Sequence, residues 1–185
     1  MRIKLTREKR ILYFKTALRW IVYSVIIFVC FVLMTSGTWL KPVLLVPVAV
    51  YISKNSGVYS SAVTGAVCGF LTDIACGKLF GYNAVVLTVF CVLTSVFFEL
   101  YLRDKFFNYF IISAFVSFVQ CVLDYKFYYD VWNYENVEII FSNVTLVVWA
   151  FTVISSVFTG LLLKLVNRIL MPRTHLTIEE AIKNN

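Results

Sequence analysis

The sequence predicts an all-α integral membrane protein, folded as a bundle of six transmembrane helices. The composition is the first reason, because 61% of the 185 residues are hydrophobic, 15% are charged and the mean hydropathy is +0.84. Soluble domains are typically about 45–50% apolar and about 25% charged. The second reason is a series of apolar runs, most of them close to the roughly 20 residues that cross about 30 Å of hydrocarbon as a helix.

The apolar runs divide the chain into spans and connections. The second run is short, contains Pro42 and Pro47, and could instead form a re-entrant hairpin. The six expected spans cover residues 18–34, 40–52, 58–76, 83–102, 107–123 and 137–166. We therefore expect a basic N-terminal arm (1–17), a membrane domain (18–166) and a short C-terminal tail (167–185).

The distribution of basic residues predicts the orientation. Lysine and arginine are retained on the cytoplasmic side of a membrane. With the N-terminus inside, only Lys41, Lys78 and Lys126 of the 17 basic residues fall on the outer side, which also carries the long aromatic loop of residues 124–138. Both termini are thus expected on the cytoplasmic side of the membrane. An even number of crossings is needed, since a re-entrant second segment would leave the basic tail outside.

The N-terminal arm, MRIKLTREKRILYFKTALRW, allows two interpretations. Its basic residues serve as a topology signal that leads into the first span, which is the interpretation we favour. Alternatively, the interleaved apolar residues would let the arm lie on anionic lipid as an amphipathic helix. A cleavable signal peptide fits less well, because further membrane segments follow. The net charge of +7 is explained by topology, and no nucleic-acid-binding module is visible.

No pattern in the sequence indicates an enzyme, a cofactor or a metal site. His175 is the only histidine and belongs to the predicted tail, so neither a catalytic triad nor a metal centre can be assembled around it. Motifs of the GxSxG, Walker A and HExxH types are absent. The cysteines form no CxxC pair and are interpreted as small buried apolar residues: Cys30, Cys68, Cys76, Cys91 and Cys121.

The stretch GAVCGFLTDIACGKLFGYNA (residues 65–84) contains the most specific pattern. Steps of four residues advance about 40° around a helix, so Gly65, Gly69 and Asp73 form one slowly winding stripe together with Ser61. Glycines at this spacing let a neighbouring membrane helix approach closely. Gly77 and Gly81 continue the spacing into the connection before the fourth span, where we expect them to shape a turn.

Asp73 could serve in three ways. It could be a solvated carboxylate near the outer end of its helix, or it could face protein and accept hydrogen bonds from turn amides near Gly77 or from another helix. A proton relay normally needs further ionisable groups within the membrane, whereas Glu99, Asp124 and Glu138 lie near predicted helix ends. We therefore favour a carboxylate that fixes the turn.

The same stretch carries a family resemblance. The pattern GxxxGxxxDxxxGxxxGxN, preceded by the proline-bearing segment KPVLLVPVAVYI, resembles the rod shape-determining protein MreD family. The matching motif residues are Gly65, Gly69, Asp73, Gly77, Gly81 and Asn83. The size, the basic start and the hydropathy profile resemble the family over most of the chain, whereas the segment after Asp104 has no motif that matches it.

The resemblance implies a non-enzymatic scaffold of the bacterial cell-elongation machinery, which acts in lateral peptidoglycan synthesis. It implies MreC as the direct partner, and MreB, RodA and a class B penicillin-binding protein as indirect partners. The family is also similar to the substrate-binding subunits of energy-coupling-factor vitamin transporters, which supplies an alternative function as a small-molecule-binding subunit. That alternative requires convergent polar groups, for which the candidates are Asn83, Asp124, Asn133 and Asn143. The partner-binding surface, the oligomeric state and any lipid or ligand within the bundle stay open.

Overall fold

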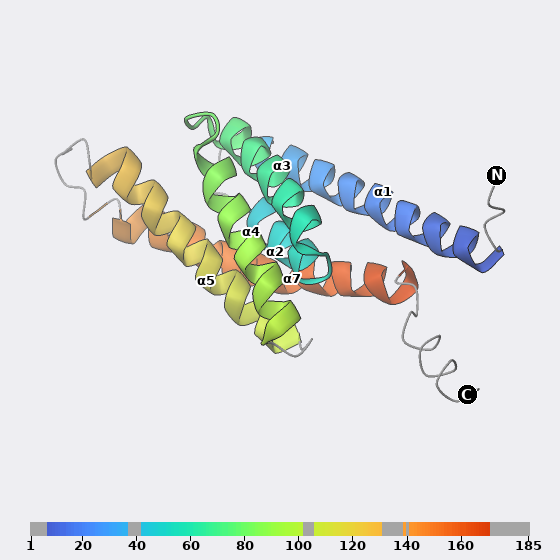
Figure 1. Ribbon diagram of the computed structural model, residues 1–185. Coiled ribbons are helices and arrows are strands. Elements are labelled where there is room, and N and C mark those ends of the chain that lie inside the picture. Colours follow the sequence, from blue (N-terminus) through green and yellow to red (C-terminus); the bar gives the residue numbers. More distant parts are fainter. Residues whose placement is uncertain (1–6, 37–41, 102–105, 131–138, 140, 171–185) are drawn as a thin grey trace.

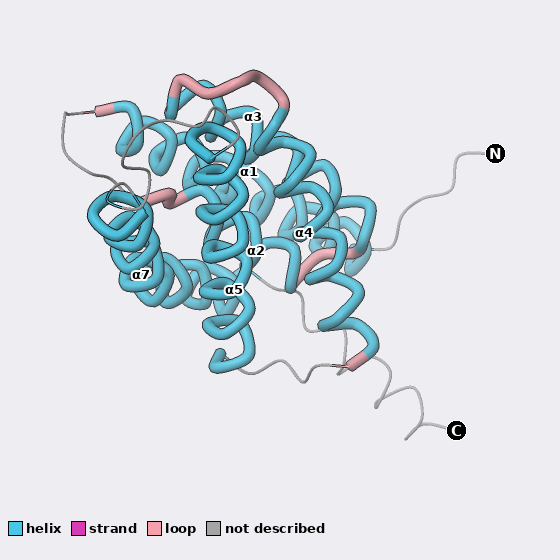
Figure 2. Tube along the Cα trace, turned by 90° about the vertical axis from the view of Figure 1, so that its left-hand side faces the viewer, coloured by secondary structure: helices cyan, strands magenta, loops and turns pink. Residues whose placement is uncertain are grey.

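The computed structural model describes residues 7–36, 42–101, 106–130, 139 and 141–170, and this part of the chain is helical without any strand (Figures 1 and 2). The helices are α1 (Arg7–Thr35), α2 (Leu45–Lys54), α3 (Val58–Cys76), α4 (Tyr82–Leu100), α5 (Phe106–Tyr125) and α7 (Leu146–Leu170), with π-helical turns η1 (Lys126–Asp130) and η2 (Phe141–Thr145). Among the described residues, five helices are long and apolar enough to cross a membrane. The all-α membrane class predicted from the sequence is thereby confirmed.

The second segment differs from the expected span. The helix α2 has ten residues, which correspond to about 15 Å, roughly half the hydrocarbon thickness. It begins after Pro42, and Pro47 lies in its first turn, where a missing amide hydrogen removes no helical hydrogen bond. Every residue from Leu45 to Ser53 is buried, and α2 contacts α1, α3, α4, α5 and α7. The proline-bearing segment therefore forms the interior helix of the bundle.

The first helix begins earlier than expected. α1 runs without interruption from Arg7, whereas the sequence suggested a span that starts at residue 18 after a separate arm. No glycine or proline interrupts residues 7–35, so nothing in this stretch opposes continuous helix formation. Most of the arm and the first span are one helix, and residues 1–6 lie outside the described part.

The remaining boundaries agree with the expected spans to within a few residues, with two exceptions. Helical structure continues past α5 through η1 to Asp130, so the beginning of the expected outer loop is helical. The last span begins with η2 and continues in α7 to Leu170, four residues beyond the predicted end at residue 166. Residues 131–138 and 140, which include the predicted start of the last span, lie outside the described part.

The helices are arranged around α2. In Figure 1, α3 and α4 lie side by side as an antiparallel pair, with their connecting turn at the top of the view, and α5 crosses α7 and packs against it. α1 packs on α2, α3 and α7, and the Tyr23 hydroxyl of α1 donates a hydrogen bond to the side-chain oxygen of Asn167 on α7. The middle of α1 is thus bonded to the C-terminal part of α7.

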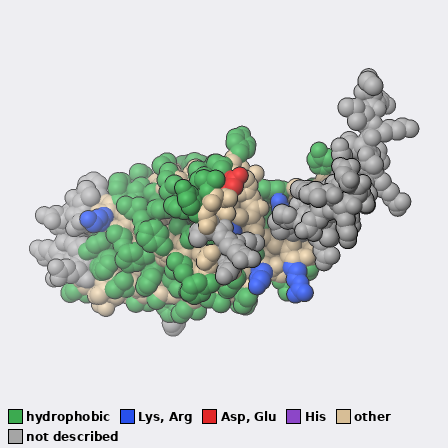
Figure 3. Space-filling view, turned by 60° about the horizontal axis from the view of Figure 1, so that its bottom comes forward, with side chains coloured by type: hydrophobic (Ala, Val, Ile, Leu, Met, Phe, Trp, Pro, Cys, Tyr) green, Lys and Arg blue, Asp and Glu red, His purple; other side chains and the backbone are tan. Residues whose placement is uncertain are grey.

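The surface of the bundle is apolar and its interior contains many polar side chains. Figure 3 shows one face covered largely by hydrophobic side chains. Exposed apolar residues occur along the long helices, and the fully buried set includes Ser61, Thr72, Asn83, Ser113, Thr152 and Ser156. This is the distribution expected in lipid, where apolar side chains gain little by burial and polar groups must bond to one another.

The cysteines follow their predicted environment except at one position. Cys30, Cys68, Cys91 and Cys121 are buried, but Cys76 is exposed at the last residue of α3. An apolar run in the sequence does not distinguish a residue that faces the bundle from one that faces outward at a helix end. The prediction that all five are buried is therefore wrong for Cys76.

Candidate functional site

The residues of the glycine pattern lie at the contact between α3 and α4. A Cβ atom added to Gly69 would lie 2.3 Å from the Cα atom of Ala84, and one added to Gly65 would lie 2.8 Å from the Cα atom of Thr88. Both distances are far below a normal van der Waals contact. The two backbones are therefore so close that glycine is the residue that fits at positions 65 and 69, as in other close-packed membrane helix pairs.

The surface of α4 that faces these glycines was not predicted from the sequence. Ala84, Thr88 and Cys91 face the glycines, because they supply the atoms nearest to the added Cβ positions. The signal was present as small residues at positions 84, 88, 91 and 95, which is helical spacing within an otherwise bulky segment. Two facing stripes of small residues thus form this helix pair.

The turn between the two helices needs glycine at both ends. Gly77 ends α3 with φ = 61°, and Gly81 precedes α4 with φ = 97°. Side chains disfavour this left-handed region, and glycine populates it readily. The chain therefore reverses direction within residues 77–81.

Asp73 caps α4 from the neighbouring helix. Its side chain is only 1% exposed, its Oδ2 atom accepts a hydrogen bond from the Gly81 amide at 2.8 Å, and its Oδ1 atom accepts one from the Asn83 amide at 3.1 Å. The first amides of a helix have no partner within it, and a helix N-terminus attracts negative charge. Gly81 has no side chain with which to cap α4. The sequence suggested donors near Gly77 or on another helix; the Asn83 amide belongs to another helix, α4, and the Gly81 amide lies at the far end of the turn from Gly77.

Asp73 also holds the near end of the turn through its main chain. Its carbonyl oxygen accepts a hydrogen bond from the Lys78 amide at 3.0 Å. One residue of α3 therefore bonds to both ends of the connection that leads into α4.

Asn83 connects the α3–α4 pair to α5. Its side-chain oxygen accepts a hydrogen bond from Gln120 Nε2 at 2.8 Å, and both side chains are buried. Since the Asn83 amide is bonded to Asp73, this residue joins α3, α4 and α5 at one point. Gln120 was missed because no sequence motif contains it.

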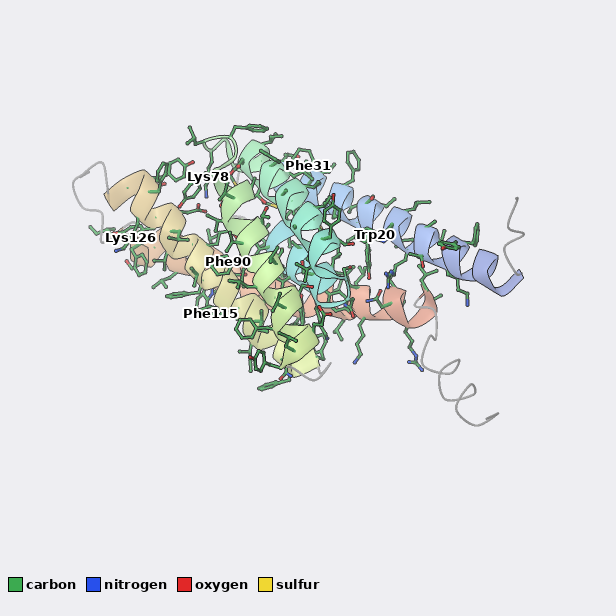
Figure 4. The ribbon with its side chains drawn as sticks, in the orientation of Figure 1. Trp20, Phe31, Lys78, Phe90, Phe115 and Lys126 are labelled. Carbon is green, nitrogen blue, oxygen red and sulfur yellow. The ribbon has the colours of Figure 1, made fainter. Side chains whose placement is uncertain are left out.

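The turn makes two further contacts with the end of α5. The Lys78 ammonium forms an ion pair with Asp124, and the Leu79 amide donates a hydrogen bond to the Tyr128 hydroxyl oxygen at 2.7 Å. Figure 4 shows Lys78 beside the turn and Lys126 just past the C-terminal end of α5, the end that also carries Asp124. Burial alone would lower the pKa of Lys78, but the nearby Asp124 carboxylate outweighs burial and raises that pKa above its ordinary value.

A polar face of α5 runs into the bundle below this contact. The residues Tyr109, Ser113, Ser117 and Gln120 are buried at spacings of four, four and three. The Tyr109 hydroxyl lies 3.3 Å from the Pro47 carbonyl oxygen of α2 and 3.2 Å from the Ser156 carbonyl oxygen of α7, so it can donate to either. Polar residues at helical spacing in an apolar segment were the available signal for this face, but the only candidate named from the sequence on α5 was Asp124.

The other polar candidates do not join this group. Glu99 and Asn143 are exposed, and Asn133, Glu138 and His175 lie outside the described residues. Within the described part of the chain, no three histidine, cysteine, aspartate or glutamate residues are grouped so as to hold a metal ion. The charged groups at the turn, Asp73, Lys78 and Asp124, are each bonded to protein groups that fix helices in place.

Comparison with known proteins gives one result that covers most of the chain. No curated protein and no solved structure matches it. The model of the family described as rod shape-determining protein MreD matches residues 8–173, a range that contains the glycines, Asp73 and the polar face of α5. The chain therefore belongs to the MreD family of rod shape-determining membrane proteins.

Proposed function

We propose that this protein is a non-enzymatic scaffold of the cell-elongation complex, which regulates cell shape and lateral peptidoglycan synthesis by binding MreC. The family match over residues 8–173 is the observation that carries the proposal. MreB, RodA and a class B penicillin-binding protein are reached indirectly, through the same complex.

The contacts at the turn support a scaffold. Asp73, Asn83 and Lys78 each bond to protein groups that hold α3, α4 and α5 in register. A catalytic group would need to be available to a substrate, whereas these groups are occupied by the fold. We propose that the motif residues Gly65, Gly69, Asp73, Gly77, Gly81 and Asn83 serve to present a rigid helix pair to the rest of the complex.

The proposed location is the bacterial cytoplasmic membrane, with both termini in the cytoplasm. Six crossings achieve this if the short second segment, which contains α2, makes the second crossing. Two observations support this path: α2 begins in the bundle interior, where the Val43 amide donates to Thr152 Oγ1 of α7 at 3.0 Å, and Lys54 at its end lies over the ring of Phe98 near the end of α4. The arm (1–17), the six-helix domain (18–166) and the tail (167–185) are proposed on the same basis.

The alternative function is that of a small-molecule-binding subunit of a transporter, and a test of the scaffold must distinguish the two. A binding subunit needs polar groups that are free to meet a ligand. Asn83 accepts from Gln120 and Asp124 is paired with Lys78, so two of the three described candidates bond within the protein, whereas Asn143 is exposed and lies apart from them. This pairing favours the scaffold.

Affinity purification of the tagged protein in mild detergent tests the proposal. The expected result is recovery of MreC with the protein, in an amount reduced by the Gly69→Leu variant, which separates α3 from α4. Glu99→Gln, at an exposed position, is the matched control and should recover MreC normally. Recovery of ATP-binding-cassette subunits without MreC would contradict the scaffold and establish the transporter alternative.

A further inference from the structure

The α3–α4 turn exposes two large apolar side chains at the end of the bundle. Leu79 is 61% exposed and Phe80 is 68% exposed, although the backbone around them is held by Asp73 and Tyr128. A rigid turn that keeps apolar groups outside the protein needs an apolar environment to receive them.

The charge of the turn is directed away from these side chains. Lys78, the only charged residue among positions 77–81, forms its ion pair with Asp124 on α5, and its ammonium also lies 5.7 Å from the ring centroid of Tyr128. The outward part of the turn is thus uncharged. Exposing an uncharged apolar tip to water is unfavourable.

The Phe80 ring continues the lipid-facing surface of α3. It stacks on Phe70 with ring centroids 4.8 Å apart and an interplanar angle of 28°. Phe70 belongs to an exposed apolar strip of α3 that also includes Val63, Val67 and Ile74. Because α3 is apolar and long enough to cross the membrane, this strip faces acyl chains, and Phe80 extends it past the end of the helix.

Aromatic rings at the same end of the bundle support this position. Tyr82 stacks on Phe127 with centroids 4.7 Å apart and meets Tyr128 edge-on. Aromatic side chains are enriched where a membrane protein crosses the boundary between acyl chains and headgroups.

From these contacts we propose that Leu79 and Phe80 insert into the lipid interface and anchor the turn end of the α3–α4 pair at a fixed depth. The occupant of this surface is lipid, at the boundary between headgroups and acyl chains. The inference concerns the membrane position of the turn and holds independently of the partner proposed above.

Photo-crosslinking tests the anchor. The photoreactive amino acid p-benzoylphenylalanine replaces Phe80 in the full chain, which is reconstituted into vesicles of phosphatidylethanolamine and phosphatidylglycerol, irradiated and analysed by intact-protein mass spectrometry. The same substitution at Phe158, which is 73% exposed on α7, gives the yield for a lipid-facing position. Substitution at the exposed Lys126, at the same end of α5 as Asp124, gives the yield for a charged position.

The expected result is a lipid adduct at position 80 with a yield close to that at 158 and several times that at 126. If the substitution at 80 prevents folding, the same substitution at Leu79 carries the test, since that side chain is also largely exposed. A yield at both positions no higher than at 126 would overturn the proposal. So would crosslinking of position 80 in native membranes to a protein in place of lipid.

Discussion

Asp73 caps the N-terminus of α4, a role that is usually filled by a side chain at the start of the same helix. Because Gly81 lacks a side chain, the carboxylate on α3 accepts the hydrogen bonds of the Gly81 and Asn83 amides. Asp73→Asn retains one acceptor oxygen and Asp73→Leu retains none. Each buried amide left without a partner costs about 1–3 kcal/mol. We expect a graded loss in thermal stability in detergent, smaller for Asn than for Leu, with cell shape partly maintained only by Asn.

The graded outcome separates capping from proton transfer. A relay would need a group that changes its charge, so Asp73→Asn would then be as inactive as Asp73→Leu. Glu99→Gln is the matched acid-to-amide control, because Glu99 is exposed on α4. Asp73→Asn protein that folds, reaches the membrane and binds MreC, yet supports no elongation, would contradict the capping role.

The pairing of Lys78 with Asp124 predicts a pH dependence. The pKa of Lys78 is raised in the folded protein, so the pair contributes fully to stability below the unfolded value of 10.5. That contribution is lost as the pH rises through the raised folded value. Unfolding temperatures measured in detergent from about pH 8 to about pH 11.5 should therefore fall more steeply for the wild type than for Lys78→Met/Asp124→Leu. Equal slopes for the two proteins would show that the pair contributes nothing.

At the scale of elements, the contact of α3 with α4 is the one most sensitive to added atoms. Gly69→Ala places a methyl group 2.3 Å from the Ala84 backbone, and overpacking of this kind typically costs about 1–3 kcal/mol. We expect a lower yield of folded protein and a lower unfolding temperature, with a smaller effect for Gly65→Ala. Gly57→Ala is the matched control, since no atom lies within 4 Å of the added Cβ there. A stable Gly69→Ala protein would contradict the close contact.

The helices could largely be predicted from the sequence, because a membrane-spanning helix is recognised by the length of its run of apolar residues. The limits of α2 could not, since the pattern KPVLLVPVAVYI does not show that the helix begins only at Leu45, after a turn at Leu44. Gly69 and Asp73 were identified by their spacing. Their partners Ala84 and Gln120 were not, because a single sequence does not show which faces of different helices meet.

At the scale of the whole molecule, the proposed topology predicts where labels react. Reporter fusions or cysteine accessibility should place residues 1–17, 53–57, 103–106 and 168–185 in the cytoplasm, and the α3–α4 turn on the opposite side. The physical reason is the retention of lysine and arginine inside, with the N-terminal cluster dominant. A C-terminal reporter that is active only outside the cytoplasm would show an odd number of crossings. The segment that contains α2 would then not cross the membrane.

The most direct test of the scaffold is the shape of cells that depend on this protein. In the source organism, depletion of the chromosomal copy should make cells round, and expression of the wild-type chain should restore rods of normal width. Asp73→Leu should fail to restore them, and Glu99→Gln should restore them fully. The readout is cell width by microscopy, with membrane levels of each variant measured in parallel. Cells that keep their rod shape without the protein, at undiminished rates of lateral peptidoglycan synthesis, would contradict the account.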